Sequence, residues 1–379
     1  MTLNEINYGF KLVEIRKLED INSVMYRFIH LKSGGMVIHL QNDDDNCCFA
    51  IGFRTKPTDS TGVCHIIEHS VLCGSERFPL KEPFVNLLKS SMATFLNAFT
   101  AYDWTMYPFA SQNKKDFNNI LAVYLDAVFN PLSVKSNKAF LQEGWHLELM
   151  DENSMPSYKG VVYNEMKGAM SSVEERLVQT TLEAMYRDTF YRYNSGGEPS
   201  DIPNLTYEAY CDFYHKHYNP QNAMSYFYGN LDIMEKLKYL DENYFSHYDK
   251  VDNPITIEAQ KPIIDTNYEV EYEIGEEESE KNNTYISLCY GLDRYDNYRD
   301  FLGMEILCDA LLSKNDSPLK KALLEAHLGE NVSARIDDDN IIPAATFSPN
   351  FASNKAFFSG ESLLESNASH RISIPKKSR

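Results

Sequence analysis

The chain has 379 residues, which at about 100–200 residues per domain indicates two domains and excludes a single small module. Hydrophobic residues make up 43% and charged residues 24% of the sequence, so a fibrous or generally disordered protein is excluded as well. Lys and Arg number 36 against 55 Asp and Glu, and the formal net charge of −19 disfavours nucleic acid as a partner and suits a cationic peptide or a metal ion.

The predicted elements begin with two strands, near 36–40 and 48–53, which lie on either side of an acidic turn and are spaced as a hairpin. Two helices follow at about 61–72 and 82–91, and Pro83 falls in the first turn of the second helix, where its missing N–H costs nothing. A pair of strands is then expected near 94–100 and 105–110.

A long amphipathic helix is expected over 113–130. Its apolar residues recur at i, i+3, i+4, i+7, i+8, i+11 and i+12, the spacing of one helix face laid on a sheet. These positions are Phe117, Ile120, Leu121, Tyr124, Leu125, Val128 and Phe129.

The rest of the chain continues to interleave helices with strands. Helices are expected at about 137–150, 159–185, 207–217 and 232–244, with a strand at 223–228. After a stretch containing Pro and Asp, strands near 268–274 and 284–290 precede helices near 298–312 and 318–327.

This order predicts an α+β fold, a layered mixed or antiparallel sheet covered by helices, followed by a second, related and incomplete domain. The expected organisation is a first domain over 1–250, a linker over 251–265, a second domain over 266–347, and a divergent tail over 348–379. The tail is rich in Ser, Asn and Lys and is expected to be poorly ordered.

Cysteine usage and hydropathy indicate the cellular compartment in which the protein is expected. The seven cysteines are odd in number and show no repeated C-x-x-C spacing, so we expect reduced thiols in a cytosol-like compartment. No apolar run approaches the roughly 18 residues of a membrane span, and no membrane partner is expected. The first 20 residues contain no apolar core of a secretory signal, which makes a cytoplasmic protein the literal expectation.

The predicted helix at 61–72 contains two histidines four residues apart. His65 and His69 lie one turn apart on one helix face, so both can reach one zinc ion. Glu68 can lie beside that ion and take a proton from its bound water, the inverse of the H-E-x-x-H order. The alternative is a helix face with two incidental histidines and a solvated Glu.

A catalytic zinc also needs a third protein ligand. Spacing alone leaves six residues open: Glu143, His146, Glu148, Glu165, Glu174 and Glu175. Cys64 and Cys73 flank the zinc motif and are interpreted as small buried hydrophobes, because two His and one carboxylate already complete a catalytic set.

The zinc motif stands within a series of ordered blocks that extends over about 8–347. The blocks are DSTGVCHIIEHSVLCGS at 59–75, PLKEPF at 79–84, TFLNAFT at 94–100, YLDAVF at 124–129, QEGW at 142–145, KGVVYNEMKG at 159–168 and SGG at 195–197. This series resembles the pitrilysin/insulinase superfamily of metallopeptidases, specifically its presequence protease and falcilysin branch.

The resemblance implies a role for particular residues and one zinc ion per chain. His65 and His69 match the zinc ligands of the family, Glu165 its third ligand and Glu68 its general base. The implied activity is that of a zinc metalloendopeptidase that cuts short unstructured peptides, such as targeting peptides.

Two further sets of residues match substrate-binding segments of the family. Asn97, Ala98 and Phe99 match the strand to which an extended peptide is added, a mode that gives affinity without a sequence requirement. The alternative is a plain core strand. Phe84, Val85 and Leu88 resemble a pocket for an apolar side chain, but their spacing is equally that of a buried helix face. Glu143 and Trp145 are expected to support the site or to pack.

Family members resemble a shell of two halves, and this chain is expected to be roughly one half. The second half contributes an Arg and a Tyr that hold the substrate carbonyl, so we expect the chain alone to be weakly active or inactive. One alternative is a non-catalytic or partner-dependent subunit, with a missing C-terminal half or a second chain as partner. The branch also makes a mitochondrion or another organelle the alternative compartment.

Overall fold

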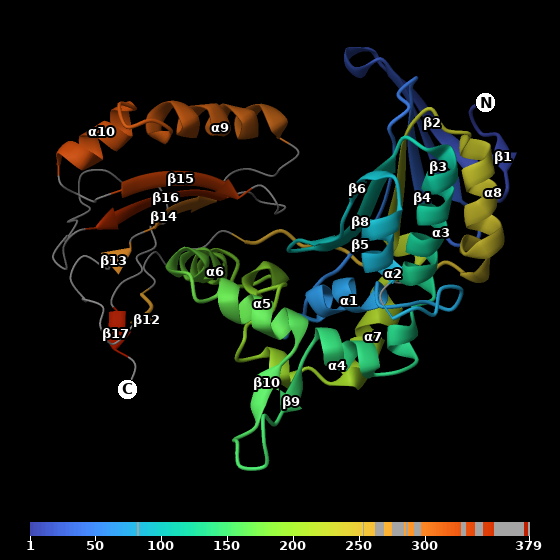
Figure 1. Cartoon of the computed structure of the whole chain (residues 1–379). Coiled ribbons are helices and arrows are strands. Elements are labelled where there is room, and N and C mark those ends of the chain that lie inside the picture. The colour runs from blue at the N-terminus through green and yellow to red at the C-terminus, as the bar shows by residue number, and fades with distance from the viewer. Residues whose placement is uncertain are drawn as a thin grey trace. The chain divides into compact units, whose positions relative to one another are not determined.

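The computed structural model describes residues 1–81, 83–252, 254–261, 269–274, 284–285, 287–291, 297–326, 331–337, 344–351 and 375–377 (Figure 1). Contacts divide the chain into two compact units, the first made of Met1–Lys167 and Ser195–Thr256 and the second of Gly168–Asn194 and Ile257–Arg379. Residues 168–194 therefore group with the second unit rather than the first. The domain boundaries drawn from the sequence stay a prediction.

The first unit is built on a nine-stranded mixed sheet. Its spatial order is β1-β2-β3-β4-β11-β5-β8-β6, with β7 also paired to β8, and every pair except β4 with β11 is antiparallel. The strands are β1 Ile6–Asn7, β2 Phe10–Leu18, β3 Ser23–His30, β4 Met36–Gln41, β5 Cys47–Arg54, β6 Ala93–Leu96, β7 Phe99–Thr100, β8 Trp104–Ser111 and β11 Ala223–Gly229.

The predicted hairpin of β4 and β5 is wrong, although both strands exist. The late strand β11 lies between them, parallel to β4 and antiparallel to β5. Instead of closing a tight turn, the acidic connection holds the end of β11: the carbonyl of Asp44 accepts the N–H of Asn230 at 2.9 Å. Turn residues indicate how two consecutive strands are joined. They contain no information about a strand from much later in the chain that pairs between them, as β11 does.

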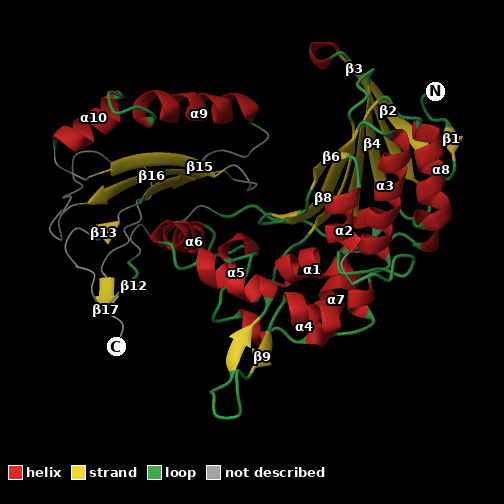
Figure 2. Cartoon of the chain, in the orientation of Figure 1, coloured by secondary structure: helices red, strands yellow, loops and turns green. Residues whose placement is uncertain are grey.

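Helices α3 Lys114–Phe129 and α8 Ile233–Asn243 run along the sheet (Figures 1 and 2). The long amphipathic helix is confirmed as α3, which Asn113 caps through its side chain. All seven predicted apolar positions of α3 are buried. The ring of Phe117 lies 4.9 Å from that of Phe109 on β8, so the helix and the sheet share one core. This core is the base on which the site helices stand.

The remaining helices of the first unit lie next to the end of the sheet (Figure 2). They are α1 Val63–Val71, α2 Pro83–Ser90, α4 Lys138–Glu143, α5 Val161–Ala169 and α7 Tyr207–His217, and a hairpin of β9 His146–Glu148 and β10 Ser157–Lys159 joins α4 to α5. Short 3₁₀ helices are Glu19–Ile21, Leu132–Val134, Phe190–Arg192, Ile202–Asn204, Pro220–Asn222 and Phe245–His247.

Two helices expected from the sequence are shorter than predicted. The helix expected over 137–150 ends at Glu143, and β9 follows it. The helix expected over 159–185 is divided into α5 and α6 Val173–Met185, and the side chain of Ser172 caps α6. Gly160 precedes α5 with φ +154°, and a Cβ there would overlap the carbonyl oxygen of Gly144. The close approach of Gly160 to Gly144 therefore sets the start of α5, and the Ser172 cap starts a separate helix α6.

The second unit contains α6 and an antiparallel sheet in which β13, β14 and β15 all pair with β16, while β12 pairs with β17. Its other elements are β12 Tyr272–Ile274, β13 Thr284–Tyr285, β14 Leu288–Gly291, α9 Tyr298–Leu312, α10 Pro318–Glu325, β15 Asn331–Asp337, β16 Ala344–Phe351 and β17 Pro375–Lys377. The α+β class is confirmed. Strands β15 and β16 were not predicted.

Parts of the second-domain predictions lie outside the described residues. This holds for the acidic run at 276–280, for the start of the strand expected at 268–274, and for most of the tail at 348–379. The described part of the tail is strand: β16 ends at Phe351, and β17 covers 375–377. No helix within the described ranges is both long and apolar enough to span a membrane.

Candidate metal centre

Helix α1 is a core helix with one open face. Seven of its nine residues are buried, and the two that are not are His65 and His69. The helix begins after Gly62, which has φ +72°, and it is tied to α7 by a hydrogen bond of 2.6 Å between the hydroxyls of Ser70 and Tyr210. Packing on the other faces of α1 therefore fixes the direction in which both imidazoles point.

Both imidazoles are oriented by acceptors at Nδ1. His65 Nδ1 lies 3.1 Å from the carbonyl oxygen of Gly196, and His69 Nδ1 lies 3.3 Å from Oε2 of Glu143. The Nε2 atoms of both rings are 3.8 Å from Oε2 of Glu165 on α5. One ligand atom from each of the three side chains lies within 4.8 Å of the other two, an arrangement able to hold a metal ion.

The carboxylates around His69 change its proton affinity. Burial alone would lower the pKa of His69, but the hydrogen bond with Glu143 and the charges of Glu68, Glu143 and Glu165 outweigh burial and raise it. Burial alone would likewise raise the pKa of Glu143, yet hydrogen bonds donated by His69 and by Gln142 lower it. Glu143 therefore stays ionised beside His69 and keeps the proton of that ring on Nδ1.

The three ligands predicted for zinc are the ones that converge. Two imidazole nitrogens and one carboxylate oxygen form a ligand set that catalytic zinc takes, with a fourth position left for water or substrate. Acceptors on the Nδ1 atoms are the usual outer partners of zinc-bound imidazoles and leave Nε2 to face the ion. The residues present therefore fit a zinc ion.

The other proposed third ligands are not part of this group. Glu143 contacts His69 on the side away from Glu165, and His146 turns its Nδ1 to the carbonyl of Leu141 at 2.7 Å. Glu148 lies on β9, whereas Glu174 and Glu175 begin α6 in the second unit. Among the residues that the structure describes, His65, His69 and Glu165 form the one such group.

A cavity of about 450 Å³ opens beside His69, one of the three candidate ligands. Glu68, which is only 8% exposed, and His69 line it together with Phe84, Val85, Asn97 and Ala98. Of the residues expected to contact substrate, Leu88 and Phe99 do not line the cavity and are 54% and 41% exposed. Four of the six expected contact residues therefore surround one opening with the carboxylate of Glu68.

The two cysteines near α1 differ. Cys64 is fully buried, as expected, and burial raises the pKa of its thiol to about 12. Cys73 is only half-buried, lines the cavity, and places its Sγ 3.4 Å from Oε1 of Glu143. The interpretation as a buried hydrophobe therefore fits Cys64 alone.

Sequence reasoning did not foresee the part that Gly196 plays. Its carbonyl orients His65, and a Cβ on Gly62 would lie 2.7 Å from that oxygen and 2.8 Å from Cα of Gly197. The signal was the Ser195-Gly196-Gly197 block, where paired glycines indicate a close backbone approach. Trp145 has a packing role, since its indole N–H donates to the carbonyl of Leu205 at 2.9 Å.

Two family models match the chain. The model described as Insulinase (Peptidase family M16) matches residues 46–194, and the model described as Peptidase M16 inactive domain matches residues 204–356. Together they account for most of the chain.

Curated relatives are similar to nearly the whole chain. Protein HypA of Clostridium perfringens is 44% identical over 336 residues, which are 88% of this chain and 34% of that protein. Presequence protease 1, chloroplastic/mitochondrial, of Arabidopsis thaliana is 42% identical over 340 residues, 88% of this chain and 31% of that protein. The chain thus spans about a third of the length of these relatives.

Solved structures show the same fold at low identity. The crystal structure of pitrilysin matches with a TM-score of 0.63 and 17% identity, covering 90% of this chain and 35% of that one. The two family models, the curated relatives and this fold lead to one conclusion: the chain belongs to the pitrilysin/insulinase superfamily of peptidases and is similar to its presequence proteases.

Proposed function

We propose that the chain is a zinc metalloendopeptidase for short unstructured peptides, with one zinc ion per chain. The observation that supports this most is the convergence of His65, His69 and Glu165, because one of them, His69, lines a cavity together with the buried Glu68. Zinc, when bound, would lower the pKa of its water to about 7 and polarise the peptide carbonyl.

The residues of the chain would share the remaining work. Glu68 would accept the proton of the attacking water on its carboxylate and deliver it to the leaving amine. Its burial keeps bulk water away from that proton. Glu143 would hold the His69 ring, while the Gly196 carbonyl holds that of His65, so both Nε2 atoms keep their direction.

The sheet edge supports a peptide substrate. Among the described strands, β6 is the end strand of the sheet and pairs with β8 alone, and Asn97 and Ala98, which follow it, line the cavity. An extended peptide added to β6 would run past Glu68, with Phe84 and Val85 as apolar contacts for one side chain. The net charge of −19 suits cationic peptides, of which targeting peptides are one class.

The test is hydrolysis of a fluorogenic unstructured peptide of about twenty residues by the zinc-loaded chain. Glu68→Gln is the matched control, because it keeps the size and removes the base. Cleavage that is about 10²–10⁴-fold slower in this variant, with zinc still bound, supports the proposal. Equal cleavage by both chains would contradict it.

A second candidate is a non-catalytic or partner-dependent subunit. The match of residues 204–356 to a domain described as inactive, and the coverage of a third of the curated relatives, both favour it. It predicts one bound zinc without hydrolysis, and a larger mass when a partner chain is added. One unchanging mass under all conditions would count against assembly. We keep the cytoplasm as the proposed compartment, with a mitochondrion or another organelle as the alternative.

A further inference from the structure

The hairpin between α4 and α5 exposes an apolar surface. Leu147 on β9 is paired directly with Tyr158 on β10, and these side chains are 59% and 45% exposed. Leu149, Met150 and Met155 continue the surface into the loop and are 61%, 77% and 86% exposed. We call these five residues the hairpin patch. A two-stranded hairpin with an uncovered apolar surface is at most marginally stable alone, so such a surface usually marks a contact site.

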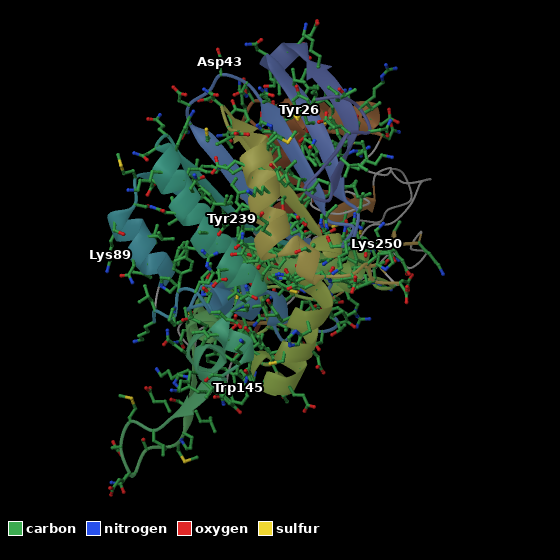
Figure 3. The ribbon with its side chains drawn as sticks, turned by 90° about the vertical axis from the view of Figure 1, so that its right-hand side faces the viewer. Tyr26, Asp43, Lys89, Trp145, Tyr239 and Lys250 are labelled. Atoms are coloured by element: carbon green, nitrogen blue, oxygen red, sulfur yellow. The ribbon has the colours of Figure 1, made fainter. Side chains whose placement is uncertain are left out.

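The root of the hairpin is firm, although its tip extends beyond the helices (Figures 1 and 3). The ring of Trp145, labelled in Figure 3, lies 5.8 Å from that of Tyr158, and its N–H donates to the carbonyl of Leu205. The Tyr158 ring also lies 5.8 Å from that of Tyr163 on α5. The hairpin patch is therefore presented on a fixed stem.

The hairpin leaves and rejoins the chain at the cavity beside His69. Gln142 and Glu143, just before the hairpin, line the cavity, and so does Val161, just after it, although no residue of the hairpin patch does. The two helices that the hairpin joins carry Glu143 and Glu165. The stem of the hairpin therefore starts at the cavity, from which a longer peptide would have to extend to reach the patch.

The charges around the hairpin patch are mostly acidic. Glu148, Asp151 and Glu152 stand in the hairpin against the single Lys159, and the described structure pairs none of the three acids with a cation. A second copy of this chain would bring a further net charge of −19, which disfavours self-association here. Met150 and Met155 add flexible apolar side chains that adapt to varied partners.

We propose that the hairpin patch is a second binding site, which takes a cationic amphipathic segment of a peptide longer than the cavity. The apolar side chains of the segment would cover the patch, and its Lys or Arg residues would meet Glu148, Asp151 and Glu152. This inference rests on the proposed function, because it concerns the same substrates. The proposed second site is the hairpin patch, which includes neither Glu68 nor the candidate metal ligands.

The test measures binding without cleavage, in the zinc-loaded full chain that carries Glu68→Gln. The probe is a fluorescein-labelled peptide of about 25 residues with Leu at helical spacing and Lys and Arg between, followed by fluorescence anisotropy. Leu147→Ser with Leu149→Ser tests the stem, and Met150→Ser with Met155→Ser tests the tip. The matched control is Ile6→Ser with Ile21→Ser, two residues 56% and 55% exposed on β1 and the first 3₁₀ helix.

We expect each hairpin pair to weaken binding about tenfold or more, and the control pair to leave it within about twofold. A probe of the same length with Glu in place of Lys and Arg should bind the parent about tenfold more weakly. The tip pair removes no packing, so its loss of binding cannot come from misfolding. Equal binding by parent and hairpin variants, absent binding by the parent, or equal binding of the acidic probe would each overturn the proposal. Hydrolysis is not measured, so inactivity of the chain does not decide the outcome.

Discussion

Helices α1 and α5 supply opposite sides of the same candidate metal centre, but they are built differently. Seven of the nine residues of α1 are buried, whereas Val162 is the one buried residue of α5, and the Glu165 side chain is 53% exposed. Packing in the core therefore holds the two histidines, whereas Glu165 stands on a surface helix with less to hold its side chain. Changes on the α1 side should therefore affect fold and metal together, and changes on the α5 side should affect the metal alone.

The largest effect is expected from removing a ligand on either side. His69→Ala and Glu165→Ala should each lower zinc affinity about a thousandfold, because a zinc site of four ligands gives about 10–16 kcal/mol in all. Competition with a chromophoric chelator measures this loss. Unaltered zinc affinity in Glu165→Ala would remove Glu165 from the ligand set.

In the metal-free chain, the same two variants compare how much α1 and α5 contribute to the free energy of unfolding. His69→Ala removes the hydrogen-bond partner of Oε2 of the buried Glu143 and should lower the free energy of unfolding by about 1–3 kcal/mol. Glu165→Ala should leave it unchanged. Urea unfolding in the presence of a chelator checks both values, and an equal loss in the two variants would contradict the comparison.

Lowering the pH should reduce the stability of the buried core before it affects α5. Burial lowers the pKa of His39 on β4 and of His217 on α7 to about 4, from 6.5 in the unfolded chain. Both are neutral in the fold, so their contribution to stability is complete above pH 6.5 and is lost as the pH falls from 6.5 toward 4. The loss is about 3 kcal/mol for each histidine at most.

Unfolding midpoints in urea between pH 7 and pH 4 measure this pH dependence. The double variant His39→Gln with His217→Gln should flatten the curve. A slope that the double variant leaves unchanged would assign the acid sensitivity to other groups.

The same Gly→Ala substitution can be made next to each helix, at Gly62 before α1 and at Gly168 on α5. Gly62→Ala forces a Cβ against Gly196 at φ +72° and should lower the free energy of unfolding by about 2–3 kcal/mol. Gly168→Ala meets no heavy atom within 4 Å on α5 and should stabilise the helix by up to about 1 kcal/mol. Thermal unfolding distinguishes the two, and destabilisation by Gly168→Ala would show that α5 is packed more tightly than its exposure indicates.

A smaller loss of zinc affinity than that from removing a ligand is expected at the outer partner of His69. Glu143→Gln keeps an acceptor for the Nδ1–H of that ring but removes the charge, so zinc affinity should fall about 10–100-fold. The matched variant Glu148→Gln makes the same change on β9 and should change affinity far less. Isothermal titration of zinc gives both numbers, and a loss as large as that of His69→Ala would make Glu143 a ligand.

Sequence patterns predicted the elements that depend on local periodicity. Helix α7 begins and ends at the predicted residues, and α3 buries every predicted position. The pairing of β11 with β4 and β5 could not be predicted, because strand order depends on contacts between distant segments. The candidate metal ligands were predicted from the spacing of the two histidines and from the resemblance to the family, and they lie close together in the structure. The role of the Gly196 carbonyl was missed, because the paired glycines indicate a close backbone approach but not the imidazole that the carbonyl meets.

The position of β11 has a consequence for how the polypeptide acquires its structure during synthesis. The facing edges of β4 and β5 stay unpaired until β11 has left the ribosome, and the roughly 170 residues between Arg54 and Ala223 take about 10–30 s to translate. Helix α1 directly follows β5, so the residues of the candidate metal centre are translated while the sheet is still incomplete. During that interval two open strand edges are available to chaperones and to aggregation.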